Sequence, residues 1–174
     1  VWLLGEARGR VKVIGRSQAF GIVQALIGKI AAFDAPVLIE GETGTGKELA
    51  ARAIHYGGAR AACPFVPVNC GALPDSLIEN ELFGHRRGAF TDAREDKPGL
   101  VELARGGTLF LDEVDALTPK GQVTLLRFLQ DQQFRPLGGR REEQANVRVI
   151  AASNRSLERQ VEAVHALHHP GMKR

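Results

Sequence analysis

The chain has 174 residues and a formal net charge of +3; 44% of its residues are hydrophobic and 25% are charged. This length allows one domain with a sizeable core, and the composition is that of an ordinary soluble globular protein. No apolar run is long enough to cross a bilayer and no signal segment is evident, so a cytoplasmic protein without membrane contact is expected. The scattered basic residues fit a solvated surface better than a nucleic-acid interface.

The first residues with a clear pattern follow a stretch, 1–12, that we interpret as the remnant of a linker. Apolar residues at helical spacing predict a helix over 18–32, with Ser17 as its N-cap. The apolar run 37–40 predicts a core strand of a parallel sheet that is covered on both faces. Cys63 and Cys70 lack the spacing of metal ligands, and we expect both thiols to be buried.

A glycine-rich segment separates that strand from a predicted helix that ends near residue 56. Its residues are Gly41, Glu42, Thr43, Gly44, Thr45, Gly46, Lys47 and Glu48. A phosphate-binding loop has this context: a strand, then a glycine-rich turn, a lysine and a helix, in this order. Glycines let successive N–H groups face an anion, the helix dipole adds to the attraction, and the lysine reaches the terminal phosphates. The segment predicts a nucleoside triphosphate site, although Glu48 occupies the position where Ser or Thr usually binds magnesium.

The middle of the chain is predicted to hold a strand, a short helix and an irregular segment. Residues 65–69 form a strand whose prolines suggest an edge position. The spacing of Ser76 and Glu79 is that of a capping box at the start of a short helix. Residues 81–93 are broken by glycines, and Phe90 is either tucked beneath this loop or presented to a partner. Packing arguments alone favour the tucked position.

Residues 106–113 predict a buried strand that ends in two acids, Asp112 and Glu113. In open α/β sheets ligands bind at the carboxyl ends of the strands. Beside a phosphate loop, Asp112 can hold Mg²⁺, most simply through water, and Glu113 can polarise the water that attacks the γ-phosphate. The alternative is that Asp112 and Glu113 have no chemical role and simply mark the point where the strand runs into a polar turn.

The last patterned elements are a helix, a polar segment and a strand. Thr118 caps the helix, and Val123, Leu126 and Leu129 are expected to form its apolar stripe, which Leu125 and Phe128 widen. Residues 135–146 predict a loop or hairpin, and 147–154 a further strand. Asn154 at its end can hydrogen-bond the γ-phosphate or its attacking water, or else simply form a turn. Asn69 can bond Glu113 if their strands are neighbours.

Three segments together resemble one family: 41–48, 81–93 and 106–113 are similar to the central AAA+ ATPase domain of bacterial sigma-54-dependent transcription activators. Glutamate after the phosphate-loop lysine is typical of that family. The resemblance implies an α/β fold, a three-layer α/β/α P-loop NTPase (AAA+) core with a mainly parallel sheet over 13–157. It also implies ATP and Mg²⁺ as ligands. It further implies nucleotide contacts from Ile14 and Gly15, and catalytic roles for Glu113, Asn69 and Asn154. The loop Gly88, Ala89, Phe90, Thr91, Asp92, Ala93 resembles the GAFTGA loop that contacts sigma-54, and 135–146 would be its companion.

Two features depart from the family. Asp92 replaces a glycine, which restricts the backbone and adds charge at the contact point. Residues 158–174 match neither the arginine-finger helix nor the helical lid, so we expect a truncated member without the lid. Ring assembly and rapid turnover are therefore in doubt. Direct DNA binding is not expected, since no helix-turn-helix follows. The functional alternatives are an ATPase that remodels the sigma-54 RNA polymerase complex, a nucleotide-binding module with little turnover, and another P-loop machine, which the loop disfavours.

Overall fold

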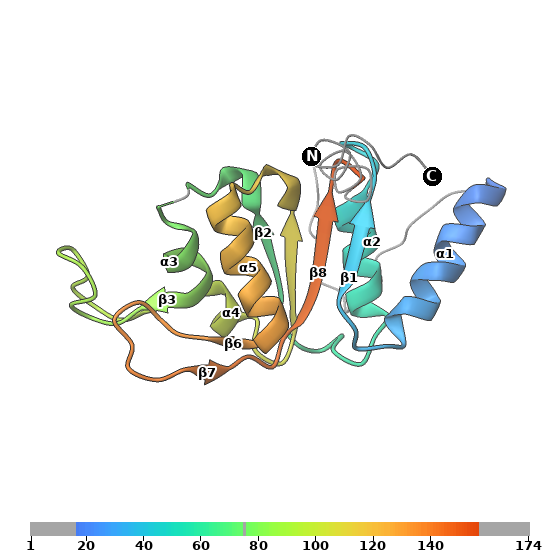
Figure 1. Ribbon diagram of the computed structural model, residues 1–174. Helices are drawn as coiled ribbons and strands as arrows, with labels where there is room; N and C mark the ends of the chain where they lie inside the picture. Colours follow the sequence, from blue (N-terminus) through green and yellow to red (C-terminus); the bar gives the residue numbers. More distant parts are fainter. Residues whose placement is uncertain (1–16, 75, 157–174) are drawn as a thin grey trace, which may run out of the picture.

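The structure is a computed structural model, and it describes residues 17–74 and 76–156 (Figure 1). The helices are α1 (Gln18–Ala31), α2 (Lys47–Tyr56), α3 (Ile78–Phe83), α4 (Leu100–Leu103) and α5 (Pro119–Asp131). The strands are β1 (Val37–Glu40), β2 (Phe65–Asn69), β3 (Gly84–His85), β4 (Lys97–Pro98), β5 (Thr108–Asp112), β6 (Gln133–Phe134), β7 (Glu143–Gln144) and β8 (Arg148–Ser153). Two short 3₁₀ turns are η1 (Cys70–Ala72) and η2 (Val114–Ala116). The predicted linker 1–12, Ile14, Gly15, the tail 158–174 and the expectation about the lid lie outside the described residues.

Four strands form one parallel sheet in the order β1-β8-β5-β2. Leu38 of β1 lies opposite Ala151 of β8, and Asn69 of β2 lies opposite Asp112 of β5. The edge position predicted for β2 is confirmed. Because the strands run in the same direction, their carboxyl ends meet at one edge of the sheet, the upper edge in Figure 1.

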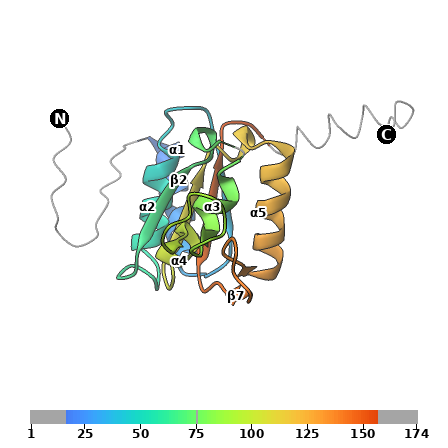
Figure 2. The same cartoon turned by 90° about the vertical axis from the view of Figure 1, so that its left-hand side faces the viewer.

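Helices cover both faces of this sheet, as the three-layer prediction requires (Figure 2). On one face α1 and α2 pack against Phe110 and Ile150. On the other face α3, α4 and α5 pack against Leu109, Leu111 and Val149. Alternate residues of β5 therefore face opposite layers, and the strand is buried on both sides, which explains its unbroken apolar run.

Two of the three predicted side-chain N-caps are confirmed. The side chain of Ser17 accepts a hydrogen bond from Phe20 N, and that of Thr118 accepts one from Gly121 N. The capping box at Ser76 is wrong, because α3 begins after Leu77, which makes no side-chain cap. Residue type alone suggested that cap, whereas the backbone at Leu77 is already helical and leaves Ser76 one position too early.

The apolar stripe predicted for α5 is confirmed for Leu125, Phe128 and Leu129, which pack in the core, and wrong for Val123 and Leu126. Val123 and Leu126 are half exposed, whereas the buried residues are Gly121, Leu125 and Phe128. The centre of the buried face thus lies on the two residues that were expected to widen the stripe, roughly 100°, one residue step, around the helix from the predicted centre. Tertiary packing decides this: Phe128 lies 5.9 Å from the ring of Phe83, and Gly121 lets α3 approach closely.

In α1, only the C-terminal part of the predicted apolar face packs on the sheet. Ile27 and Ile30 join the core, but Ile22, Val23 and Leu26 are exposed. Within the described residues, no helix combines the length and apolar character that crossing a bilayer requires.

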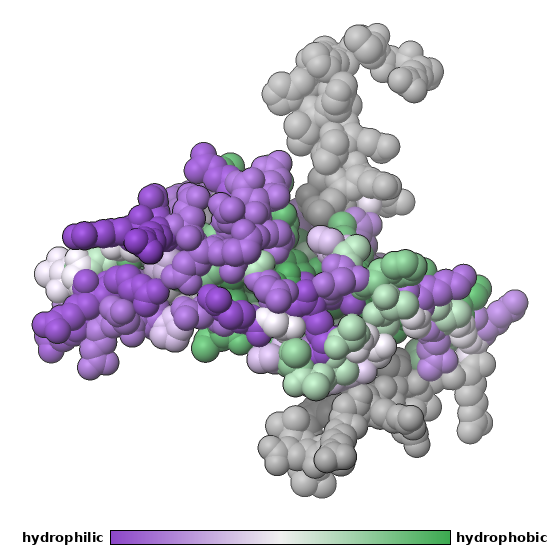
Figure 3. All heavy atoms as spheres, turned by 90° about the horizontal axis from the view of Figure 1, so that it is seen from below, coloured by the Kyte–Doolittle hydropathy of each residue, from purple (hydrophilic) through white to green (hydrophobic). Residues whose placement is uncertain are grey.

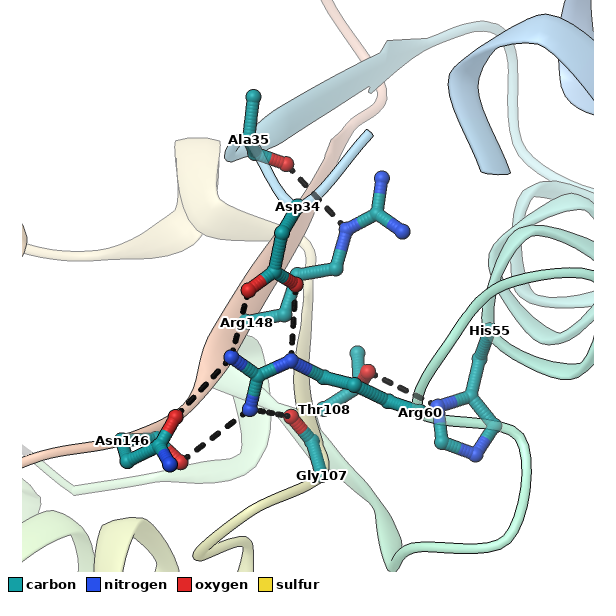
Figure 4. Close-up of polar contacts among 8 residues, drawn as sticks. All are labelled: Asp34, Ala35, His55, Arg60, Gly107, Thr108, Asn146 and Arg148. Atoms are coloured by element: carbon teal, nitrogen blue, oxygen red, sulfur yellow. Dashed lines mark hydrogen bonds and ion pairs between the residues drawn. The ribbon is translucent and has the colours of Figure 1, made fainter. Parts of the chain in front are cut away.

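At the lower end of the sheet, Arg60 ties together the segments that lead into three strands (Figure 4). Its guanidinium makes two bonds to the carboxylate of Asp34, at 2.6 and 2.8 Å, and donates to Asn146 Oδ1 at 3.0 Å. It also donates to Gly107 O. The buried Arg148 donates to the carbonyl oxygens of Ala35 and Ile30 nearby. These contacts fix the spacing of β1, β5 and β8 at the end opposite the predicted nucleotide site.

A separate polar region projects from the α3–α5 side of the molecule. It consists of the loop 86–96 between β3 and β4, and the antiparallel hairpin β6–β7, which confirms the hairpin option for 135–146. Seen from below, hydrophilic side chains dominate this end of the molecule (Figure 3). This surface stands apart from the strand ends that carry the predicted site.

Candidate nucleotide-binding site and partner loop

Predicted site residues lie at or just after the carboxyl ends of all four strands, along the same edge of the sheet. The phosphate loop follows β1, Asn154 follows β8, the acids Asp112 and Glu113 end β5, and Asn69 ends β2. Residues separated by more than a hundred positions in sequence thereby line up along one edge. This is the place where parallel α/β sheets bind their ligands.

The phosphate loop has the backbone shape that its glycines were expected to permit. Gly44 and Gly46 have φ values of 81° and 85°, in the left-handed region that side chains disfavour. Gly46 is the N-cap of α2, and Thr45 Oγ1 donates to Glu42 O at 2.7 Å. The free N–H groups of the first turn of α2 therefore follow directly on the loop, an arrangement that favours an anion.

Lys47 is 8% exposed, and its ammonium group is held by three hydrogen bonds. Nζ donates to Gly41 O at 2.8 Å, to Glu42 O at 2.9 Å and to Asn154 Oδ1 at 2.8 Å. The bond to Asn154 joins the loop after β1 to the end of the neighbouring strand β8. Both side chains were predicted to meet the terminal phosphate, and the structure brings them into contact.

Glu48 is engaged by Arg52 one helical turn later. The two side chains form an ion pair at 2.7 Å, and the Arg52 guanidinium lies 4.7 Å above the ring of Phe65. Glu48 is thus directed along the surface of α2.

The two acids at the end of β5 differ in conformation. Asp112 Oδ1 accepts a hydrogen bond from Glu113 N at 2.9 Å. Glu113 has φ 54° and ψ 44°, a left-handed conformation that costs free energy for a residue with a side chain. Its carboxylate passes close to Gly71, where a Cβ atom would lie 2.7 Å from Glu113 Oε2. The glycine therefore leaves room for the carboxylate.

Asn69 lies beside these acids, since β2 and β5 are neighbours as expected. Its side-chain oxygen accepts from Ala72 N at 3.2 Å, and this oxygen is 3.2 Å from the same Cβ position at Gly71. In the part of the chain that the structure describes, no hydrogen bond joins Asn69 to Glu113. The restraint of Glu113 by Asn69 stays a prediction.

Cys70 packs next to the acids but is not a nucleophile. Burial, together with the negative charges of Asp112 and Glu113, raises the pKa of this thiol to about 12. It therefore stays protonated at neutral pH. The predicted burial is confirmed for Cys70 and wrong for Cys63, which is exposed.

Asp115 is a site residue that the sequence patterns did not identify. It lies in η2, two residues after Glu113, and its Oδ1 accepts a hydrogen bond from Asn154 N at 3.0 Å. An acid in a turn gives no local indication that its partner lies 39 positions away, so only the sheet order could have suggested this contact.

The predicted partner loop, Gly88 to Ala93, is closed by backbone bonds. Gly88 N donates to Ala93 O at 2.8 Å, and Ala93 N donates to Phe90 O at 3.0 Å. Phe90 is 44% exposed, and its ring lies edge-to-face with that of His85, the two ring centroids being 4.9 Å apart. The tucked position is therefore wrong, because almost half of the surface of Phe90 remains exposed.

Asp92 does not strain this loop. Among the non-glycine residues that the structure describes, only Glu113 and Gln132 have positive φ. Asp92 therefore adopts an ordinary backbone conformation, and the expected backbone penalty for replacing glycine is absent in this structure. The replacement of glycine by Asp92 therefore changes only the charge of the loop, because it adds a negative charge on an exposed side chain.

The loop rests against the hairpin that was expected to accompany it. Arg86 N donates to Leu137 O, and Gly138 approaches Ala89 so closely that a Cβ would lie 2.8 Å from the Ala89 Cβ. The Arg86 guanidinium bridges Asp96 at 3.3 Å and Glu143 at 3.1 Å. Hydrogen bonds from Arg87 N and the Arg86 side chain lower the pKa of the Asp96 carboxyl. The two surface segments therefore form one unit.

Comparisons with known proteins agree with this geometry. The family model described as "Sigma-54 interaction domain" matches residues 13–168. The chain belongs to the sigma-54 interaction domain family. The domain is 59% identical over 135 residues to the hydrogenase transcriptional regulatory protein HoxA of Bradyrhizobium diazoefficiens, covering 78% of the chain and 28% of that relative. It is 49% identical over 155 residues to the Nif-specific regulatory protein of Enterobacter agglomerans, covering 89% and 30%.

Solved structures give the same result. NtrX from Brucella abortus, crystallised in complex with ATP, superposes with a TM-score of 0.79 at 35% identity, covering 91% of this chain and 35% of that one. The α/β P-loop NTPase fold is thus confirmed. The chain spans about a third of the length of these relatives.

Proposed function

We propose that this domain binds ATP with Mg²⁺ and hydrolyses it, and that the hydrolysis drives remodelling of the sigma-54 RNA polymerase complex in the cytoplasm. The bond between Lys47 Nζ and Asn154 Oδ1 is the observation that supports this most strongly. It places a phosphate-loop lysine and a polar strand-end side chain at one point, beside the acids of β5. The crystallised ATP complex of NtrX supports ATP as the nucleotide.

In this proposal, each strand end has a separate task. Lys47 and the N–H groups of α2 hold the β- and γ-phosphates, and one phosphate oxygen replaces an acceptor of the Lys47 ammonium. Asn154 bonds the γ-phosphate or the attacking water. Glu113 orients that water, whose oxygen bonds to the γ-phosphorus while the bond to the β–γ bridging oxygen breaks. ADP and inorganic phosphate leave, and the proton of the water passes to the phosphate products.

The residues at the end of β5 fit a magnesium ion. Carboxylate oxygens are the ligands that Mg²⁺ favours, and Asp112 retains acceptor capacity beyond its bond from Glu113 N. Asp112 would hold the ion, directly or through water. When bound, Mg²⁺ neutralises charge that develops on the phosphate oxygens.

The partner in this proposal is sigma-54, contacted by the unit of the loop Gly88–Ala93 and the β6–β7 hairpin. The outward half of Phe90 supplies an apolar contact on an otherwise polar surface. Asp92 adds a negative charge there, which favours a basic site on the partner. The sequence similarity to transcription regulators such as HoxA supports this partner.

A second candidate is a nucleotide-binding module with little turnover. Within 17–74 and 76–156, no arginine side chain bonds to Lys47, Asp112, Glu113 or Asn154. Arginines that stabilise the transition state raise phosphoryl-transfer rates by about 10³–10⁵-fold, so their supply from a neighbouring copy would decide the rate. Only the first candidate, the ATPase, requires self-association into a ring.

Steady-state phosphate release, measured over a range of protein concentrations, separates the two candidates. Lys47→Ala is the control in which nucleotide binding is weakened. Specific activity that rises with concentration and vanishes in the control supports an assembling ATPase. ATP binding without phosphate release supports the binding module, and absence of ATP binding contradicts both.

The partner is tested by capture of purified sigma-54 with a non-hydrolysable transition-state mimic of ATP. Phe90→Ala should abolish capture, while Val123→Ala, a half-exposed apolar side chain on α5, should leave it unchanged. Equal capture by both variants would contradict the assignment of the loop.

A further inference from the structure

The contact between Asp115 and Asn154 connects the ends of two neighbouring strands above the sheet. Asn154 follows β8, and Asp115 lies in η2, which follows β5. The bond from Asn154 N to Asp115 Oδ1 is 3.0 Å long and partly buried. A carboxylate acceptor makes it a charge-assisted bond, stronger than a bond between neutral groups.

This bond fixes the backbone of the residue whose side chain meets Lys47. Asn154 is held from two sides, because its N–H donates to Asp115 while its Oδ1 accepts from Lys47 Nζ at 2.8 Å. The neighbouring turn is also tight, since Ser153 Oγ donates to Arg155 O and accepts from Arg155 N. The Asn154 side chain therefore has little freedom to leave the phosphate loop.

The same carboxylate belongs to the turn that carries Glu113. Ala116 N donates to Glu113 O at 2.9 Å, so Asp115 lies inside a turn that starts at the left-handed Glu113. An acid at the start of a 3₁₀ turn ordinarily caps an N–H of its own turn. Asp115 Oδ1 instead reaches to β8, so local capping does not explain its placement.

We propose that Asp115 is a positioning residue, which holds Asn154 against Lys47 and so lets the site distinguish ATP from ADP. The inference rests on the proposed function of the site and assigns to it a residue beyond the phosphate loop, the β5 acids and the strand-end asparagines. Asp115 itself touches no phosphate. It acts through Asn154, whose side chain faces the group that only the triphosphate has.

The test compares the affinities of the chain for fluorescent ATP and ADP analogues in the presence of Mg²⁺. Asp115→Ala removes the acceptor, Asp115→Asn keeps a neutral oxygen at the same place, and Asp131→Ala is a matched control at an exposed acid of α5. We expect Asp115→Ala to lower the ratio of ATP to ADP affinity by roughly fivefold or more, the effect of one misplaced hydrogen bond. Asp115→Asn should restore most of the ratio, and Asp131→Ala should leave it unchanged.

A second set of variants shows whether Asp115 acts through Asn154. In an Asn154→Ala background, adding Asp115→Ala should cause no further change of the ratio, because the side chain that it positions is absent. An equal loss in that background would overturn the inference, as would an unchanged ratio in the single variant. If Asp115→Ala fails to fold, Asp115→Ser, which is too short to reach, takes its place.

A readout without nucleotide separates this inference from the proposed function. The backbone amide of Asn154 should exchange with deuterium faster in Asp115→Ala than in the unaltered chain or in Asp115→Asn. Failure of the unaltered chain to bind ATP would contradict the proposed function, and unchanged exchange at Asn154 would contradict the inference.

Discussion

Lys47 and Asn154 are 107 positions apart in sequence, yet their side chains meet at 2.8 Å. The sheet order explains the contact, since β1 and β8 are adjacent and parallel and both residues follow the carboxyl end of their strand. The lysine charge is thereby held at the sheet edge in a partly buried position. It is oriented toward the place where a terminal phosphate is proposed to bind.

Lys47→Ala should weaken ATP binding by roughly 10- to 100-fold, the effect of losing a charged hydrogen-bond donor. The fold should persist, because the main chain of the loop keeps its glycine turns and the bond from Gly41 N to Ser153 O. Calorimetric titration with ATP and Mg²⁺ measures the change. Lys120→Ala, at an exposed position in the first turn of α5, is the matched control and should bind as the unaltered chain does.

Gly71→Ala should redirect the Glu113 carboxylate. The new Cβ would lie 2.7 Å from Glu113 Oε2, the far end of a flexible side chain, so the carboxylate moves while the backbone stays. We expect phosphate release to fall and ATP affinity to stay within about twofold, because Glu113 orients water and does not hold nucleotide.

The control for this substitution is Gly28→Ala in α1, where a Cβ meets no atom within 4 Å. It should leave phosphate release unchanged and stabilise the helix by about 0.5–1 kcal/mol. Unchanged turnover in Gly71→Ala would contradict the proposed role of the Glu113 carboxylate or its location beside Gly71.

The parts of the fold that depend on local sequence were predictable. Strands β5 and β8 are determined by unbroken apolar runs, and the phosphate loop after β1 is determined by the spacing of its glycines and lysine, each within a few residues. The residues of α5 predicted an apolar stripe that includes Leu125 and Phe128, but they did not predict which side of the stripe is buried, because contacts with Phe83 and Ile78 on α3 select it. Asp115 was missed for a similar reason, since its partner Asn154 belongs to a different strand.

Arg86→Gln should loosen the partner loop without unfolding the domain. It removes the bridge to Asp96 and Glu143, both partly exposed, so the effect on global stability should be small. The backbone amides of Gly88 and Ala93 should exchange with deuterium faster, and capture of sigma-54 should weaken. In the unaltered chain, high salt should have a similar effect on exchange, because exposed ion pairs are screened.

Arg87→Gln is the matched control for the loop. Its guanidinium makes no hydrogen bond or ion pair with the described residues, while its backbone N–H still donates to Asp96 Oδ1 at 2.7 Å. Its exchange pattern should equal that of the unaltered chain. If both variants accelerate exchange equally, loss of surface charge and not the bridge would be the cause.

His55 should make the domain less stable in mildly acidic solution. The side chain is 1% exposed and bonds Thr108 Oγ1 at 2.8 Å, and burial lowers its pKa from 6.5. Between 6.5 and the lower folded-state pKa, the unfolded chain binds a proton that the folded chain does not. The free energy of unfolding therefore falls as pH decreases through this window, by at most about 1.4 kcal/mol per pH unit.

Denaturant unfolding of His55→Asn between pH 7 and 5 checks this prediction. The variant should show a flatter pH dependence, since asparagine does not titrate and can still bond Thr108. The carboxyl of Asp34 does not interfere, because its hydrogen bond with Arg60 lowers its pKa below 3.8 and its contribution is lost only in stronger acid. A slope as steep in His55→Asn as in the unaltered chain would show that another group governs stability in this range.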